Sequence, residues 1–195
     1  MTDSTATKPL HAGDGEGGFT LIELMITVAI IAVLALLAGV GYARYIRTAK
    51  TGEATAMLNA IKGAEESYKA ETYKYLDVSG VPGGTSMPAY YPTSSPNDQR
   101  ANWNPAGCVG TPICANFVKL NISSDNTSAG VYYRYGVTAG SATGSTFTFD
   151  GRAYPAANDP WFVVKAIGDL NNDGVQSQYW SSSMDSTVWS VKPDE

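Results

Sequence analysis

Histidine and cysteine are scarce in this sequence, which has one histidine and two cysteines among 195 residues. The histidine, His11, precedes a long apolar run, so the chain beyond that run has no imidazole base for Ser-His or Cys-His nucleophilic catalysis. Two cysteines with no histidine near them cannot complete a zinc site of the Cys-rich or Cys-His kind. We therefore expect a protein that is not an enzyme.

Basic residues are also fewer than acidic ones, with 13 Lys and Arg against 18 Asp and Glu and a net charge of −5. Residues 1–18 hold −2 of that charge, which leaves −3 for the remainder. Nonspecific nucleic-acid binding needs Lys and Arg to displace the counterions of the phosphates. The acidic balance therefore argues against a nucleic-acid partner.

Charge is missing altogether from residues 24–43, an uncharged stretch of 20 residues. As a helix it would extend roughly 30 Å, the thickness of a bilayer's hydrocarbon core. We expect a hydrophobic membrane helix over residues 19–43, preceded by a polar segment, residues 1–18. Glu23 lies near the start of this helix, where an ionised carboxylate costs on the order of several kcal/mol.

The helix is expected to continue as an amphipathic segment over residues 44–76. Its apolar residues recur at helical spacing with polar residues between them, which is the pattern of a half-buried helix. The repeating apolar residues are Ala54, Met57, Ile61, Ala64 and Tyr68. The alternative is two separate helices with a break near Gly52.

Residues 77–130 are rich in Pro, Gly and Ser and predict an irregular loop region. This region holds the two cysteines, Cys108 and Cys114, in the stretch "CVGTPIC". In an exported domain the two would pair as a disulfide that closes a short loop, whereas two buried free thiols are the alternative.

Residues 131–195 predict an antiparallel sheet of about four strands. Apolar and aromatic residues alternate there with Tyr132, Arg134 and Thr138, a period of two; they are Val131, Tyr133, Tyr135 and Val137. The stretch "TFTFDG" is expected to return beside this strand, and "WFVVKAIG" and "STVWSV" supply two more strands. The fold class is therefore α+β, with one sheet face packed on the amphipathic helix. The strand tyrosines are expected to pack within the fold rather than form a sugar-binding surface.

The stretch "GDLNNDGVQSQYW" places oxygen-bearing side chains on alternate residues before a glycine, a spacing that suits calcium. The candidate ligands are Asp169, Asn171, Asp173, the carbonyl of Val175, and Ser177. Trp180 stands where a closing Glu would complete the ligand shell. The alternative is a plain turn in which Asp and Asn side chains bond to their own backbone.

The stretch "GGFTLIELMITVAIIAVLALLAGVGYARYIRTA" resembles the N-terminus of type IV pilins and pilin-like proteins. The matching features are Gly18 followed by Phe19, Glu23, the long apolar run and the tyrosines after it. The resemblance implies that a prepilin peptidase removes residues 1–18 and that the new amine of Phe19 is methylated. It also implies that Glu23 pairs with the N-terminus of a neighbouring subunit during assembly.

The same resemblance implies a structural filament subunit as the function, and it names the partners. They are other copies of the chain, other pilin subunits, the prepilin peptidase and the inner-membrane assembly machinery. The precursor would be stored in the inner membrane before it enters an extracellular pilus or a periplasmic pseudopilus. A pseudopilin of a type II secretion system is the alternative, and a membrane-tethered adhesive or ligand-binding domain is a third hypothesis.

Positive charge follows the apolar run, at Arg44, Arg47 and Lys50, and charge bias alone would predict the reverse membrane orientation. The cleavage motif predicts that the residues after the run lie outside the cytoplasm. Gly39 and Gly41 stand where related proteins usually have a proline, and each weakens a helix by roughly 1 kcal/mol.

Overall fold

A computed structural model describes residues 18–94, 96–108, 110–122 and 130–193. The chain divides into two compact units, Met1–Tyr42 and Ala43–Glu195. The first unit holds the start of helix α1 (Leu21–Thr72), and the second holds the rest of α1 and all the other elements. The helix is continuous through Gly52, so the alternative of two separate helices is wrong. The expected leader lies outside the described residues except for Gly18.

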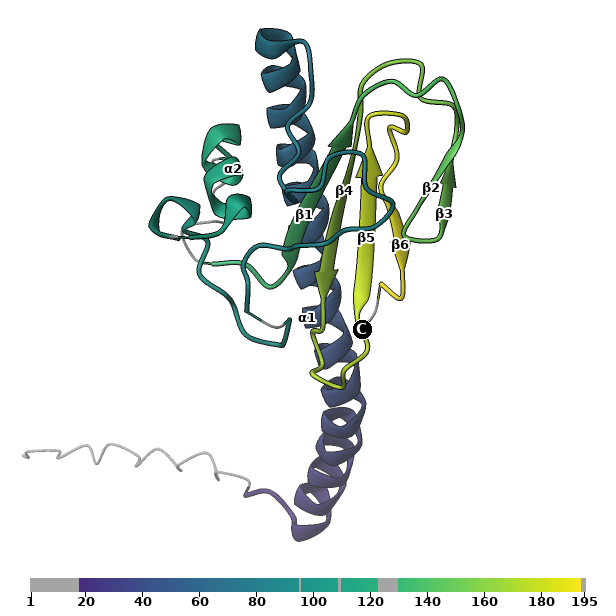
Figure 1. Cartoon of the computed structure of the whole chain (residues 1–195). Helices are drawn as coiled ribbons and strands as arrows, with labels where there is room; N and C mark the ends of the chain where they lie inside the picture. The colour runs from purple at the N-terminus through teal and green to yellow at the C-terminus, as the bar shows by residue number, and fades with distance from the viewer. Residues whose placement is uncertain (1–17, 95, 109, 123–129, 194–195) are drawn as a thin grey trace, which may run out of the picture. The chain divides into compact units, whose positions relative to one another are not determined.

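The second unit is an α+β fold, as expected (Figure 1). Four strands form an antiparallel sheet in the order β1-β4-β5-β6, and two more form a separate hairpin, β2-β3. The bounds after α1 are η1 (Pro105–Gly107), α2 (Pro112–Leu120), β1 (Arg134–Gly140), β2 (Phe147–Phe149), β3 (Arg152–Tyr154), β4 (Trp161–Gly168), β5 (Ser177–Ser182) and β6 (Trp189–Val191).

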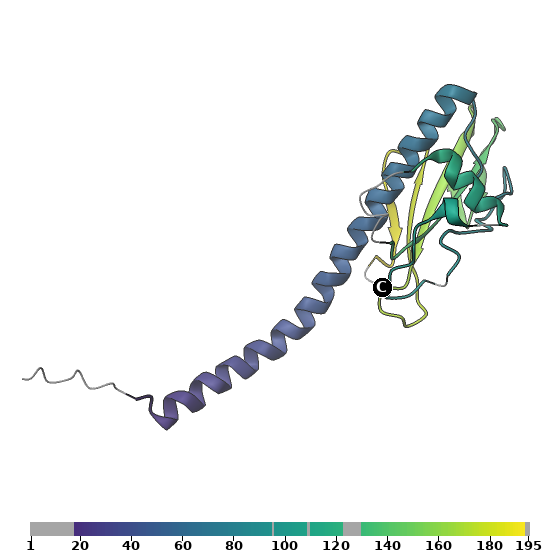
Figure 2. The same ribbon diagram turned by 90° about the vertical axis from the view of Figure 1, so that its left-hand side faces the viewer.

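The second part of α1 runs along one face of the four-stranded sheet (Figures 1 and 2). Ala54, Met57 and Ile61 are buried there, as their helical spacing predicts. They share one core with residues of β1 and β4, including Tyr135 and Phe162. Ala64 and Tyr68, nearer the end of α1, are only partly buried against it. Burial of this stripe supplies the main apolar contact between helix and sheet.

Strand β4 is buried along its whole length because both sheet faces are covered. Phe162 and Val164 point into the core with α1, whereas Trp161 and Val163 point into a second cluster on the other face. That cluster includes Phe149 and Tyr154, from the two strands of the β2-β3 hairpin. A strand that is covered on both faces usually has a nearly continuous apolar sequence, and "WFVVKAIG" is such a sequence.

Several details differ from the expected arrangement. The stretch "TFTFDG" does not return beside β1; it pairs with β3, and β1 pairs with β4 instead. Strand β5 was not expected, because it follows the acidic loop directly. Helix α1 ends at Thr72 rather than residue 76, with Tyr73 in the left-handed conformation at φ 61°.

The expected irregular region also contains a helix, α2, which begins at a proline in its first turn. Its buried residues, Ile113, Cys114, Phe117 and Leu120, fall on one side of the helix and join the core with α1. The helix was not predicted, because the Pro- and Gly-rich composition around it favoured an irregular loop. Tyr133 and Tyr135 are fully buried, which agrees with the expectation that they pack within the fold.

Candidate functional site

The N-terminal end of α1 brings Thr20 and Glu23 together. The Thr20 backbone N–H donates to Glu23 Oε2 at 2.9 Å, and the Thr20 hydroxyl donates to the same oxygen at 2.7 Å. In return, the Glu23 backbone N–H donates to the Thr20 hydroxyl at 3.3 Å. This reciprocal pattern is a capping box, which satisfies N–H groups that a helix start leaves without partners.

No role was predicted for Thr20, although the T-x-x-E spacing before an apolar run is the sequence signal of a capping box. The capping box has a chemical consequence for Glu23. Glu23 Oε2 accepts both hydrogen bonds from Thr20, so the carboxylate has an internal partner while the peptide bond before Phe19 is intact.

The apolar residues that follow Glu23 are exposed in the single chain. Leu36 is 76% exposed and Ile30 is 54% exposed. Within the described residues, α1 is the helix long and apolar enough to cross a membrane. An apolar surface of this extent needs lipid or other protein to cover it.

The predicted cleavage point, between Gly18 and Phe19, precedes the first turn of α1. Phe19 is 87% exposed, so no packing within the described chain shields this peptide bond. A Cβ atom added at Gly18 would meet nothing within 4 Å. The described chain itself therefore does not require glycine at this position, and a requirement for it would come from a partner that approaches the backbone closely.

The cysteine pair lies at the start of α2, where Cys108 and Cys114 form a disulfide with a Cα–Cα distance of 5.8 Å. The alternative of two free thiols is therefore wrong. Cys114 is fully buried in the core with α1, so the bond ties the segment before α2 to that core.

The candidate calcium loop connects β4 to β5. Asp169 is buried and accepts from the backbone N–H groups of Asp173 at 3.2 Å and Gly174 at 3.0 Å. Asp173 accepts from Val175 N–H at 2.7 Å and from the Asn171 side chain at 3.0 Å. In most of these bonds the side chains of the loop accept from its own backbone, as expected for the alternative of a plain turn.

The other predicted ligand, Ser177, begins β5 and is fully buried. Its hydroxyl donates to the Gly168 carbonyl at 3.2 Å. No group of three or more His, Cys, Asp or Glu side chains suited to a metal occurs among the described residues. Calcium binding by this loop stays a prediction.

If the loop binds calcium, the full chain in detergent should melt several degrees higher in millimolar calcium than in chelator, because a ligand that binds only the native state stabilises it. Asp173→Ala should abolish this difference, and magnesium should have little effect because it prefers a tighter octahedral shell. Asp159→Ala, which alters an exposed aspartate before β4, should preserve the difference. Equal melting temperatures in calcium and chelator would leave the stretch as a turn.

Two carboxylates on α1 are buried, which the helical pattern did not reveal. Glu53 Oε1 accepts from the Tyr132 backbone N–H at 2.6 Å, and burial raises the pKa of this carboxyl. Glu65 is fully buried, and its Oε2 accepts from the Leu76 backbone N–H at 2.9 Å. Each carboxylate thus links a later segment of the chain to α1 through a backbone hydrogen bond.

The environment of Glu65 disfavours its charged form. Burial raises the pKa of the Glu65 carboxyl to about 8, the hydrogen bond from Leu76 opposes the rise, and nearby Asp77 and Glu66 add to it. The Oε1 atom is buried and makes no hydrogen bond within the described part of the chain. Ionisation of Glu65 should therefore weaken the folded state.

This pKa predicts how stability depends on pH. Between the ordinary value of 4.5 and the folded value of about 8, the folded state binds a proton that the unfolded state has released. The contribution of Glu65 to stability is complete below pH 4.5. It is lost as pH rises from 4.5 through about 8, at up to about 1.4 kcal/mol per pH unit. Glu65→Gln should remove this decline and melt higher than the unchanged chain at pH 9.

Thermal melts of the full chain in detergent across this pH range would check the prediction. Glu71→Gln is the matched control, because Glu71 is exposed on the same helix. A parallel pH dependence in the unchanged chain and in Glu65→Gln would show that Glu65 ionises normally.

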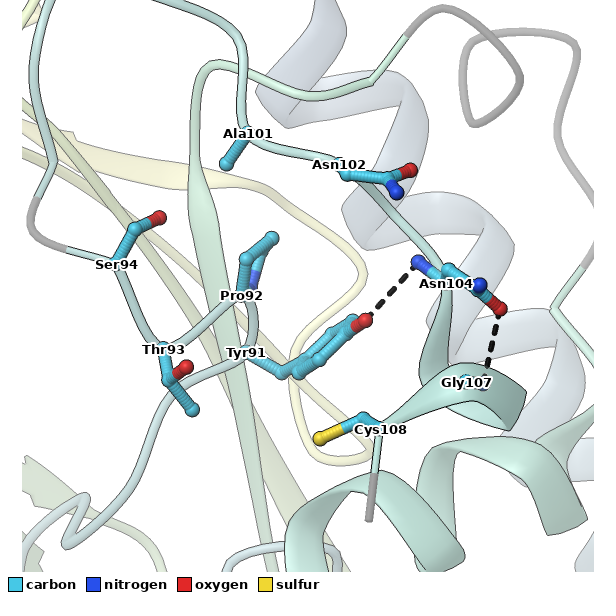
Figure 3. A pocket seen from close by; sticks show the side chains of 9 residues that line it. All are labelled: Tyr91, Pro92, Thr93, Ser94, Ala101, Asn102, Asn104, Gly107 and Cys108. Atoms are coloured by element: carbon cyan, nitrogen blue, oxygen red, sulfur yellow. Dashed lines mark hydrogen bonds between the residues drawn. The ribbon is translucent and has the colours of Figure 1, made fainter.

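A pocket of about 400 Å³ lies between residues 91–94 and the segment before α2 (Figure 3). The Tyr91 hydroxyl accepts from the Asn104 backbone N–H at 2.9 Å, and the Asn104 side chain accepts from Gly107 N–H at 3.0 Å. The described residues that line this pocket carry amides and hydroxyls but no carboxylate, lysine or histidine. The pocket therefore offers no acid–base pair for catalysis.

The long helix on an antiparallel four-stranded sheet matches a type IV pilin-like fold. Residues 14–39 match the family model for the prokaryotic N-terminal methylation motif, which is the prepilin-type cleavage motif of type IV pilins. A search of curated proteins and a search of solved structures gave no match to this chain. The matched segment contains Gly18, Phe19 and Glu23, and it ends within the apolar run.

The motif and the fold together support a type IV pilin-like or pseudopilin subunit. They imply processing by a prepilin peptidase and assembly with other pilin subunits. An apolar N-terminal helix fits a precursor anchored in the membrane and later assembled into a filament. Proteins of this type are structural subunits rather than enzymes.

Proposed function

We propose that this protein is a structural subunit, a pilin or minor pilin, of an extracellular type IV pilus-like filament. The observation that carries the proposal is the placement of Glu23 in the first turn of an exposed apolar helix, within the methylation motif. Prepilin peptidase removes residues 1–18, and the remaining subunit is held in the inner membrane by residues 19–43 until assembly.

Cleavage changes the charge at the head of the helix. Before cleavage the Phe19 nitrogen is an uncharged amide, and afterwards it is an ammonium, which keeps its charge when methylated. Glu23 Oε2 already accepts both bonds from Thr20, which leaves Oε1 for an incoming donor. The amine of a neighbouring subunit supplies that donor, and the two charges offset each other's cost in an apolar filament core.

The second candidate is a pseudopilin of a type II secretion system, which shares the motif, the anchor and the fold. A membrane-tethered adhesive or ligand-binding domain is the third. This third candidate would keep its binding activity in cells without prepilin peptidase, because a tether needs no cleavage.

Imaging of cells that carry a fluorescently labelled copy of this protein tests the proposal. Surface filaments that contain the label, disappear without prepilin peptidase and increase in number without a retraction motor would support it. Label confined to the cell envelope, together with loss of protein secretion on deletion, would favour the pseudopilin. Unchanged surface binding without the peptidase would favour the tethered domain.

A further inference from the structure

The three basic residues that follow the apolar run, Arg44, Arg47 and Lys50, are not used in the proposed function. No acidic residue lies among them before Glu53. At about 1.5 Å per residue, Lys50 lies roughly 10 Å along the helix from the end of the uncharged run. A bilayer's headgroup layer occupies about 5–7 Å on each side of the hydrocarbon core. These cations are therefore at or next to the headgroups when α1 crosses a membrane.

The last of the three lines a groove of about 430 Å³ on the second unit. Lys50 Nζ lies 4.2 Å from the centre of the Tyr132 ring, and Arg100 Cζ lies 4.6 Å from the same centre. Lys50 Nζ donates a long hydrogen bond, 3.4 Å, to the Asp98 backbone carbonyl. The Arg100 side chain is 39% exposed. Both cations are thus held at one ring and remain open to a further partner.

Among the described residues that line this groove, Glu53 is the one acid, and its carboxylate is directed inward. Its side chain is 6% exposed, and Oε1 accepts from the Tyr132 backbone N–H. The other oxygen, Oε2, lies 3.9 Å from Arg100. Lys50, Arg100 and Glu53 together leave one net positive charge, Arg44 and Arg47 add two, and Asp98, whose backbone carbonyl lies beside Lys50, removes one. In a chain of net charge −5, this is a local reversal of sign.

We propose that this groove binds the phosphate of an anionic phospholipid headgroup, in the leaflet on which the folded second unit lies. The groove also has apolar lining from Ile46 and Ala49, which suits the glycerol and upper acyl region of a lipid. Tyr45, four residues before Ala49 on α1, is 70% exposed, as expected for an aromatic residue at a membrane interface. A phosphate bridges Lys50 and Arg100 with charge-assisted hydrogen bonds.

The position next to the headgroup layer favours a lipid over an acidic side chain of a second subunit. It also gives a role to the cations that charge bias alone would place on the cytoplasmic side. Bound headgroups hold the folded unit against the membrane while the subunit is stored, and the contact is released when the helix leaves the bilayer. This inference rests on the membrane-anchored precursor of the proposed function.

The test uses the full chain reconstituted in phosphatidylcholine vesicles with a trace of spin-labelled lipid. Electron paramagnetic resonance then measures how strongly labelled phosphatidylglycerol associates with the protein relative to labelled phosphatidylcholine. Each juxtamembrane cation contributes about 1 kcal/mol near an anionic headgroup, which is about a fivefold preference. We expect at least a fivefold preference for phosphatidylglycerol at low salt, a smaller one at high salt, and a loss of about fivefold in Lys50→Gln.

Lys50→Arg should keep the preference, and so should Lys74→Gln, which removes one charge just beyond the far end of α1. Equal association of the two lipids with an inserted chain, or an unchanged preference in Lys50→Gln, overturns the inference. An unchanged preference accompanied by loss of filaments would assign the cations to a subunit contact instead. Failure to insert in neutral vesicles would overturn the membrane anchor itself, and this inference with it.

Discussion

Cells whose only copy of this protein carries Glu23→Val should insert the protein in the membrane normally and make few or no filaments. Valine makes the helix more apolar, so insertion is kept or improved. Assembly, however, loses the carboxylate that offsets the amine of the neighbouring subunit. Removing one partner of a buried ion pair costs about 3–5 kcal/mol, which lowers the equilibrium constant for adding a subunit by about a hundredfold or more.

Membrane fractionation and counts of filament number and length measure the two halves of this prediction. Thr27→Val is the matched control, because it also makes the helix more apolar but leaves the charge in place. If this protein is a minor subunit, the strain must lack other subunits of its class. Normal filament number and length in Glu23→Val cells would reduce Glu23 to an acid at the membrane surface.

Glu23→Gln separates the charge from the capping box. A glutamine at this helix position can still accept from Thr20, so the first turn of α1 is preserved. Because the neutral amide cannot offset an ammonium, we expect filaments to be lost in Glu23→Gln as well. Full filament assembly in Glu23→Gln, with loss in Glu23→Val, would show that capping rather than charge is the role of this residue.

Gly18→Val should leave the protein as an uncleaved precursor in the membrane and abolish filaments. A Cβ at this position meets nothing within 4 Å, so the substitution does not disturb the described fold. Its effect therefore reports on the peptidase, which must approach the backbone closely at the scissile bond. Immunoblots should show the larger precursor alone, with less than about a tenth processed, which corresponds to at least about 1.4 kcal/mol in the cleavage step.

Gly41→Ala is the control for this experiment, because it adds a methyl group within the same apolar helix, also with nothing within 4 Å. Its processing should be normal. Complete processing of Gly18→Val would move the cleavage point to another peptide bond and remove the basis for the role of Phe19.

Periodic patterns in the sequence predicted the parts of the fold that pack over several turns. The spacing of Ala54, Met57 and Ile61 placed the helix stripe that meets the sheet, and alternation placed Tyr133 and Tyr135 in the core. The strand pairing was harder to predict, because β1 pairs with β4 across the intervening hairpin rather than with the next strand. The short sequence separation between β1 and β2 led to the wrong prediction that these two strands pair.

Local capping and buried charge account for the parts that were missed. Thr20 had a visible signal in T-x-x-E, but Glu23 was interpreted only through its charge. Nothing local marked Glu65 for burial, because its partner, Leu76, reaches it only after the chain turns at the end of α1. Tertiary contacts of this kind override the polar character that a helical pattern assigns.

The proposed function requires that the mature subunit begins at Phe19 and enters a filament through that end. Filaments sheared from cells, purified and analysed by intact and N-terminal mass spectrometry test it most directly. We expect a subunit that lacks residues 1–18 and begins with N-methylated Phe19. A filament subunit that begins at any other residue, or that retains residues 1–18, would contradict it.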